Sequence, residues 1–337
     1  MISYSNWSVL TASFLVVLYL ALGGVTLSAV LHLVGAQWRY EVRRLAICLY
    51  ALFPLAFVLL VILLVGGENT FPWLSTATEP GHHLPAWHNY TFLVARQVIG
   101  LLLVMAIFWV FIKRQAVSDR SNEDQESFHT IACWIPYVFV LYGTMIAWDF
   151  EMTMVPSWHS AIYGMQHFIS NFNMFMAFLV TWIYILNTRG KLVRPIGDHL
   201  YNYLAQMMFA FTLLWVYTFF AQYLVTWYAN LPGEVDRVMA MQNGDYTVLW
   251  WSMIVLKLFI PFCVLAMRAS RHSPPIILTV AASIIVGTLF ERYIWISGVN
   301  GTGTVPVLAV LVITPVLAVT GFLLVRRMMA SNHLIKV

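Results

Sequence analysis

Charged residues are scarce in this 337-residue chain. Asp, Glu, Lys and Arg together make up 9% of it and hydrophobic residues 61%, whereas soluble domains carry about 25% charged residues. The composition therefore excludes an ordinary soluble protein and predicts an all-α integral membrane protein surrounded by lipids. The formal net charge of +4 indicates loop topology and not an affinity for nucleic acid.

Cysteine and nucleotide-binding motifs are also scarce or missing. Three cysteines, Cys48, Cys133 and Cys263, lie far apart in apolar segments without a C-x-x-C or C-x-x-C-H pattern, which excludes a cysteine-bound iron–sulfur cluster and a covalently attached haem. The lack of a G-x-x-x-x-G-K-[ST] loop excludes an ATP-driven pump of that type. A di-haem cytochrome b needs paired histidines in mid-membrane, but here His167 alone lies deep and His32 is isolated. We expect no covalently bound cofactor and no metal site.

Nine apolar runs are long enough to cross a bilayer, which takes about 20 residues. The first run lacks a basic start and is too long for a signal peptide, so it is predicted to be a permanent span. The predicted spans are residues 9–35, 45–66, 91–113, 131–148, 158–186, 205–227, 247–267, 275–296 and 304–325. The whole chain is therefore expected to form a single polytopic membrane domain, residues 1–337.

Basic residues gather in alternate connections between these spans, and Lys and Arg are retained on the cytoplasmic side. Fourteen of the 18 basic residues follow this rule: Arg39, Arg43, Arg44, Lys113, Arg114, Arg120, Arg189, Lys191, Arg194, Arg268, Arg271, Arg326, Arg327 and Lys336. The pattern predicts an outer N-terminus and a cytoplasmic C-terminus.

The stretch from Trp148 to Asn173 carries ionisable groups at a membrane boundary, where they are costly and tend to be functional. Asp149 and Glu151 are expected to precede or open the fifth span, where the helix dipole favours carboxylates. Together with His159, which titrates near neutral pH, they are predicted to form the outer mouth of a proton path.

Further polar groups are predicted in the outer half of the membrane. A rise of 1.5 Å per residue places Arg96, Gln222, Glu291 and Arg292 roughly 7 Å below the outer surface, and His167 and Lys257 roughly 13–15 Å below it. A lysine at that depth needs an acid, water or a neutral state. We therefore predict that Lys257, His167 and Glu291 line a polar, hydrated half-channel. The inner half is nearly bare of ionisable groups apart from His32 and the arginines at the helix ends.

One stripe of the fifth span is polar at helical spacing. It comprises Tyr163, His167, Ser170 or Asn171, and Met174, with Gln166 and Asn173 beside it. Two interpretations remain open: interhelical hydrogen bonds worth about 0.6 kcal/mol each, or a quinone or proton site. The candidate quinone or polar pocket comprises Arg96, Tyr163, Gln166, Asn171, Gln222 and Arg292.

Two outer connections have compositions suited to binding another protein. The loop 67–90 carries the group His82, His83 and His88, which fits no standard metal site and is interpreted as solvated. The loop 228–246 follows aromatic residues at the end of the sixth span, and aromatic and arginine side chains often anchor interfaces. The predicted docking residues are Trp227, Tyr228, Asn230, Glu234 and Arg237.

Four segments carry a resemblance to a known family. They are Trp148-Asp149, MTMVPSWHSAIYG at Met152–Gly164, FFAQYLVTWYANLPGEVDR at Phe219–Arg237 and LFIPFCVL at Leu258–Leu265. Over about residues 130–270 the chain resembles the shorter NrfD-like (polysulfide reductase family) membrane subunit of alternative complex III, a bacterial quinol:cytochrome c oxidoreductase. Relatives tend to read P-H-W-F-S-T where this chain reads PSWHSA at Pro156–Ala161, so a quinol-oxidising histidine does not transfer directly.

The resemblance implies two four-helix bundles plus one extra span, in a bacterial inner membrane. It implies a subunit that bears no cofactor in a quinol-oxidising electron-transfer complex, with quinol or menaquinol bound at the level of the complex. The implied partners are a sister NrfD-like subunit, a periplasmic iron–sulfur subunit and c-type cytochrome subunits. A polytopic transporter or a passive anchor remains the alternative, although a transporter should show inverted repeats with broken spans.

Overall fold

The computed structural model describes residues 4–77, 84–118, 120–229, 234–298 and 303–336. In this part of the chain nine helices are long and apolar enough to cross a membrane. The prediction of an all-α membrane protein with nine spans is therefore confirmed. Across the same residues the β-type pairing is limited to an isolated bridge between Leu192 and Ile335.

The spans have the following bounds. The first four are α1 (Tyr4–Leu33), the joined α2 (Arg39–Ala46), η1 (Ile47–Leu52) and α3 (Phe53–Val65), then α6 (Tyr90–Val117), and α7 (Asn122–Ala147) with η2 (Trp148–Met152). The next four are α8 (Tyr163–Thr188), α9 (Asp198–Ala229), the joined α11 (Thr247–Ile254), η3 (Val255–Phe259) and α12 (Ile260–Ala266), and α14 (Pro274–Ser297). The last is α15 (Val307–Ser331), and four short helices lie in the connections: α4 (Gly67–Thr70), α5 (Trp73–Ala77), α10 (Glu234–Asn243) and α13 (Arg268–Arg271).

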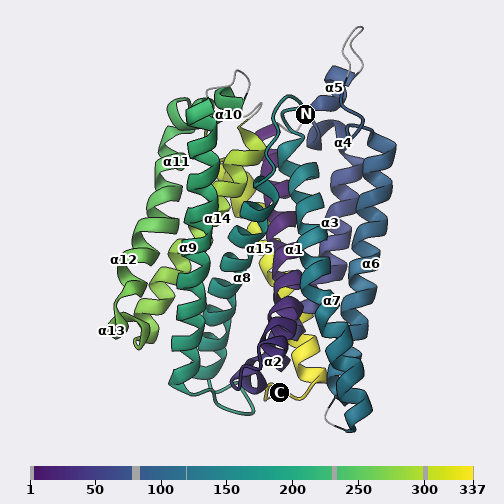
Figure 1. Ribbon diagram of the computed structural model, residues 1–337, viewed down its shortest axis with the longest axis vertical. Coiled ribbons are helices and arrows are strands. Elements are labelled where there is room, and N and C mark those ends of the chain that lie inside the picture. Colours follow the sequence, from purple (N-terminus) through teal and green to yellow (C-terminus); the bar gives the residue numbers. More distant parts are fainter. Residues whose placement is uncertain (1–3, 78–83, 119, 230–233, 299–302, 337) are drawn as a thin grey trace.

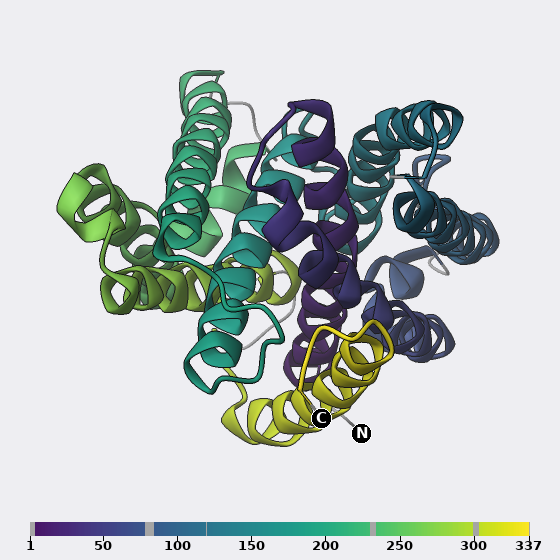
Figure 2. The same cartoon turned by 90° about the horizontal axis from the view of Figure 1, so that it is seen from below.

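The spans divide into two groups of four. Spans one to four pack together, spans five to eight form the second group, and α15 packs on the outside against η1 and α1 (Figures 1 and 2). This is the arrangement that the family resemblance implies. The helix α1 lies between the two groups, with 89% of its most apolar window buried against 6% for α15. A helix that is apolar on every side is suited to such a central position.

Two span boundaries differ from the prediction around the polar stretch. The fourth span continues to Met152, because η2 adds a π-helical turn, and the fifth begins at Tyr163 and not at 158. Asp149 and Glu151 therefore lie at the C-terminal end of the fourth span. The proposed stabilisation by the N-terminal dipole of the fifth span is wrong, since a helix C-terminus disfavours carboxylates.

The two ends of the chain lie at opposite faces (Figure 1). The face with the C-terminus also carries α2 and α13, and with them the basic connections named above; we call it the basic face. An odd number of spans places the termini in this way. That the basic face is cytoplasmic stays a prediction.

A close approach between α1 and α2 depends on a glycine. A Cβ added to Gly24 would overlap the carbonyl oxygen of Ala46, a backbone atom that cannot swing aside. The central helix can therefore reach the second span only if this position lacks a side chain.

We expect Gly24→Ala to destabilise the fold by about 1–3 kcal/mol, as overpacking does. The matched control is Gly321→Ala, whose added Cβ would lie 3.2 Å from the flexible end of Leu52. Melting temperatures in mild detergent should fall for Gly24→Ala and change little for the control. Equal melting temperatures of Gly24→Ala and the wild type would contradict the close contact.

Candidate functional site

Two π-helical turns carry three of the charged side chains at the site. In η2 the Thr153 N–H bonds the Trp148 carbonyl at 2.9 Å, and this turn holds both predicted carboxylates. In η3 the Ile260 N–H bonds the Val255 carbonyl, and this turn holds Lys257. Single π-turns inside α-helices are frequent at functional sites.

A proline, Pro261, lies four residues after Lys257, just beyond the second π-turn. In a regular helix the ring of Pro261 would clash with the carbonyl four residues earlier, that of Lys257. A wider turn over Val255–Phe259 separates these groups while the span continues. Gly287 on α14 then makes room for the lysine, because an added Cβ there would lie 2.5 Å from the Lys257 Cγ.

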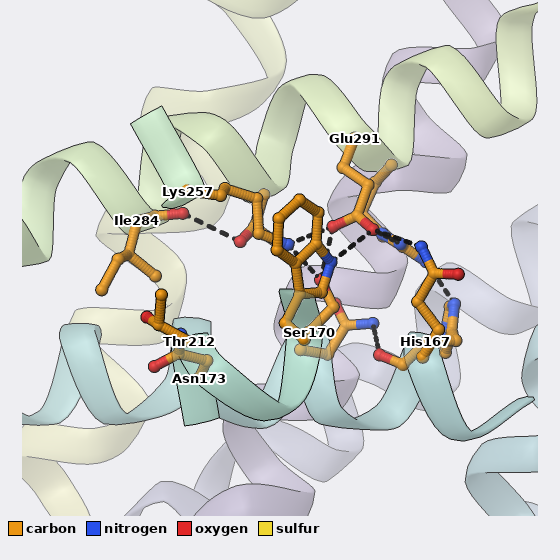
Figure 3. Close-up of polar contacts among 12 residues, drawn as sticks. His167, Ser170, Asn173, Thr212, Lys257, Ile284 and Glu291 are labelled. Carbon is orange, nitrogen blue, oxygen red and sulfur yellow. Dashed lines mark hydrogen bonds and ion pairs between the residues drawn. The ribbon is translucent and has the colours of Figure 1, made fainter. Parts of the chain in front are cut away.

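Lys257 is bound to a carboxylate on α14 (Figure 3). Its Nζ contacts Glu291 Oε2 and donates to Ser170 Oγ at 2.6 Å, and Ser170 in turn donates to Glu291 Oε2 at 2.5 Å. Trp215 on α9 donates from its Nε1 to Glu291 Oε1 at 3.0 Å, and Lys257 lies over its ring, 4.3 Å from the centroid. Four spans thus converge on one buried ion pair.

A second carboxylate lies beside the first. Glu151 Oε2 accepts hydrogen bonds from Arg292 Nη1 at 2.5 Å and from the Tyr163 hydroxyl, and lies 2.6 Å from His167 Nδ1. Arg292 Nη2 is 3.0 Å from Glu291 Oε1. The Arg292 guanidinium therefore joins the two carboxylates, and Lys257 to His167 forms one connected chain of charges.

The proton on His167 has two competing neighbours. Its Nδ1 faces both the Glu151 carboxylate and Arg292 Nη1, so this nitrogen can donate to the first or accept from the second but not both. The Nε2 atom has no hydrogen-bond partner among the described residues. If Arg292 moved away from this nitrogen, Nδ1 would be free to donate to Glu151.

A third carboxylate forms a separate cluster with α6. Asp149 accepts two hydrogen bonds from Arg96, from Nε at 2.8 Å and from Nη2 at 2.5 Å, and further ones from Gln97 Nε2 and from Trp87 Nε1 at 2.8 Å. The Arg96 guanidinium also lies 4.1 Å from the centroid of the Trp87 ring. Bidentate arginine–carboxylate pairs are among the strongest charged hydrogen bonds. Nearby, burial lowers the pKa of the loop residue His88 below its ordinary value.

The charges of these clusters balance. Three carboxylates face three cations, and at most 9% of any of the six residues is exposed: Asp149, Glu151, Glu291, Arg96, Lys257 and Arg292. Removing an ion from water costs several kcal/mol, which close partners must compensate. A balanced set with short contacts is the arrangement in which such charges are tolerated inside a membrane protein.

The network is closely packed. A cavity beside it, lined by Gln166 and Gln222 among others, has a volume of about 10 Å³, roughly enough for one water. Lys257 and His167 are connected through the side chains of Glu291 and Arg292. Proton exchange between them through water stays a prediction.

Several predicted site residues lie elsewhere. His159 is exposed while Asp149 and Glu151 are fully buried in different clusters, so the predicted three-residue mouth is not formed. The Asn171 side chain donates to the backbone carbonyl of His167, one turn earlier in the same helix, at 2.8 Å. The Gln222 Oε1 atom has no hydrogen-bond partner among the described residues.

His32 lies at the basic face, where its Nε2 is 3.4 Å from His129 Nδ1. The ring is half-buried beside Phe128, with the two centroids 4.4 Å apart. It therefore does not open onto the network.

The predicted docking residues divide into two kinds. Trp227 and Tyr228 are 60% and 84% exposed, whereas Arg237 points inward, donating to the carbonyls of Glu151 at 2.8 Å and Trp295 at 3.0 Å. The assignment of Arg237 as a docking residue was wrong, since its side chain holds α10 against the spans. Burial of the Arg237 guanidinium lowers its pKa to about 10. Asn230, His82 and His83 lie outside the described residues.

Sequence reasoning missed Gln97 and Trp215. Gln97 follows Arg96 directly, so its polarity inside a span was a usable signal. Trp215 lies seven residues before Gln222, on the same face of α9, but an aromatic side chain in an apolar span gives no sign that its N–H binds a buried acid.

Compared with known family models and with curated protein sequences, the chain matches none. Among the described residues, no group of three or more His, Cys, Asp and Glu side chains is arranged to hold a metal ion. The buried network is therefore the feature of the molecule that bears on its function.

We expect Lys257→Met and Glu291→Gln each to destabilise the protein by about 3–5 kcal/mol, because each leaves a buried charge without its partner. The double variant should cost at least about 1 kcal/mol less than the sum of the two, since coupled neighbours are not additive. Melting in detergent measures all three, with exposed Lys113→Met as control. Additive losses would show that the pair is not coupled.

Proposed function

We propose that this chain is a membrane subunit of a quinol:cytochrome c oxidoreductase of the alternative complex III type, and that it carries protons through the half of the membrane away from the basic face. The observation that carries the proposal is the charge-balanced chain from Lys257 through Glu291, Arg292 and Glu151 to His167. A membrane protein with a purely anchoring role has no need to bury these groups at such cost.

The network has the chemical groups that proton transfer needs. Carboxylates, a lysine and a histidine are arranged in direct contact, and each can take up or release a proton when its partner moves. Tyr163, which donates to Glu151, adds a hydroxyl at the same carboxylate. Because the packing leaves room for about one water, transfer requires side-chain rearrangement, which turnover of the complex would drive.

The same packing favours a proton role over a quinone pocket in this subunit. Arg96, Tyr163 and Arg292 are engaged in ion clusters, and the cavity at Gln166 and Gln222 is about 10 Å³, against roughly 300–1,000 Å³ for ligand pockets. Quinol oxidation is then a task of a sister NrfD-like subunit. Electrons pass to iron–sulfur and c-type cytochrome subunits on the periplasmic side.

In the assembled complex reconstituted in liposomes, we expect Lys257→Met/Glu291→Gln to abolish most proton release while quinol:cytochrome c activity is largely kept. The double variant removes the titratable pair without leaving an unpaired buried charge. The control is Thr212→Val, which breaks the Asn173–Thr212 hydrogen bond of 3.0 Å between α8 and α9, the two helices that supply Ser170 and Trp215 to the ion pair.

Unchanged proton release in the double variant would contradict the half-channel and leave the pair a structural element. A chain that purifies without redox subunits and moves a solute would instead support the transporter alternative. If Thr212→Val also lost both proton release and quinol:cytochrome c activity, disturbed helix packing and not a specific loss of proton transfer would explain the results.

We further expect the exposed end of α9 to contact the periplasmic subunits. Replacing Tyr228, which is 84% exposed, together with Glu234 by alanine should reduce their co-purification several-fold while the membrane subunits stay paired, because aromatic residues anchor interfaces. The matched control is Tyr217→Ala on the same helix, 65% exposed but within the span. Full recovery of the periplasmic subunits with the double variant would count against docking at this end.

A further inference from the structure

A cavity of about 460 Å³ opens at the basic face, far from the charged network. It is bordered by three segments that are distant in sequence: α2, residues 192–196 between α8 and α9, and residues 332–334 after α15. Its walls combine apolar side chains, including Leu45, Leu192 and Ile196, with the cationic Arg44 and Arg194. We call it the headgroup cavity.

The two arginines are available to an anion. Among the described residues, neither the Arg44 nor the Arg194 side chain forms a hydrogen bond or ion pair, and both are exposed. The acid that lines the cavity, Glu41, is already bound, with its Oε1 2.7 Å from His199 Nε2. The cavity therefore has uncompensated positive charge.

The cavity is held in a fixed shape by the end of the chain. The Val193 N–H donates to the Leu334 carbonyl at 3.1 Å, and the Lys336 N–H donates to the Lys191 carbonyl at 2.8 Å. These bonds join residues 334–336, after α15, to the loop that carries Arg194. As a result His333 also borders the headgroup cavity. Arg194 is thus held next to the tail, and the Glu41–His199 contact joins α2, which carries Arg44, to the beginning of α9.

A second cavity of about 440 Å³ lies within the membrane region, between α1, the second span, α8, α14 and α15. Leu49, Leu52 and Leu55 of the second span and Phe322 and Val325 of α15 line it, and almost all of its lining is apolar. We call it the acyl cavity. Leu45 of the headgroup cavity and Leu49 are one turn apart on the same face of the second span.

We infer that the two cavities together bind an anionic diacyl phospholipid, with its phosphate at Arg44 and Arg194 and one acyl chain in the acyl cavity. The distance from Arg44 to Leu55 is about 16 Å along the helix, which an acyl chain can span. Basic pockets at the cytoplasmic ends of spans recognise anionic headgroups. The inference does not depend on the proposed function.

The lipid would also explain the position of α15. This helix has few buried side chains and borders the acyl cavity along Thr314–Val325. An acyl chain in that space supplies contacts that the neighbouring spans do not. Bound lipid therefore fastens α15 to α1 and η1.

The test uses the delipidated full chain in non-ionic detergent, titrated with dioleoyl phosphatidylglycerol or dioleoyl phosphatidylcholine and followed by native mass spectrometry. We expect Arg44→Gln/Arg194→Gln to weaken phosphatidylglycerol binding about 30-fold and to leave phosphatidylcholine binding unchanged. The charge-matched control, Arg114→Gln/Arg268→Gln, removes two exposed arginines that border neither cavity and should bind phosphatidylglycerol as the wild type does.

Two further arms separate the sources of phosphate and test the acyl cavity. Inorganic phosphate and dihexanoyl phosphatidylglycerol should not displace the long-chain lipid at equal concentration. Ala318→Trp, which fills the acyl cavity, should weaken binding of both dioleoyl lipids. Equal affinity for the two lipids in the wild type, an equal loss in the control variant, or displacement by inorganic phosphate would each overturn the inference.

Discussion

The interaction on which the rest of the site depends is the Arg292 guanidinium between two carboxylates, Glu151 and Glu291. Without it, two buried acids would repel each other, and one of them would have to take up a proton. With it, Lys257 is left to balance Glu291 and His167 is placed beside Glu151. One arginine on α14 therefore sets the positions of groups that come from η2, α8 and η3.

This constraint accounts for the irregular backbone around the site. A carboxylate at the end of the fourth span is opposed by the helix dipole, so η2 is stable there because its acids contact Arg96 and Arg292. The π-turn η3 likewise delivers Lys257 to Glu291 ahead of a proline. Local backbone preference is overridden at these two turns by the requirement that each buried charge reach its partner.

Hydropathy and the distribution of basic residues were sufficient to predict the nine spans, because crossing a membrane demands length and apolarity that few other structures need. They could not predict which acid meets which base, since that depends on how each helix is rotated. One error was avoidable. Asp149 and Glu151 were expected to share the outer mouth of a proton path, yet residues two apart on a helix do not face each other, and the structure places them in separate clusters. The inward turn of Arg237 had no signal, because a loop arginine beside aromatic residues is equally suited to a surface.

Along α1 the polar contacts of the network end at Tyr19 on the side toward the basic face, and this bears on where a proton would have to enter. The Tyr19 ring contacts His167, with centroids 5.2 Å apart, while the next buried polar pair on this side of α1 is Ser28 with Gln115 at 2.8 Å. Ser28 lies nine positions after Tyr19, which is about 13.5 Å along α1, and the Thr26 hydroxyl between them donates to the carbonyl of Leu22 in its own helix. A proton cannot cross such a distance between fixed side chains without water. A path through the whole membrane along α1 would therefore need either water admitted between α1 and α7 or a partner subunit that supplies the second half. Transfer toward the opposite face would also need the network to rearrange, because Glu151, His167 and Glu291 are fully buried.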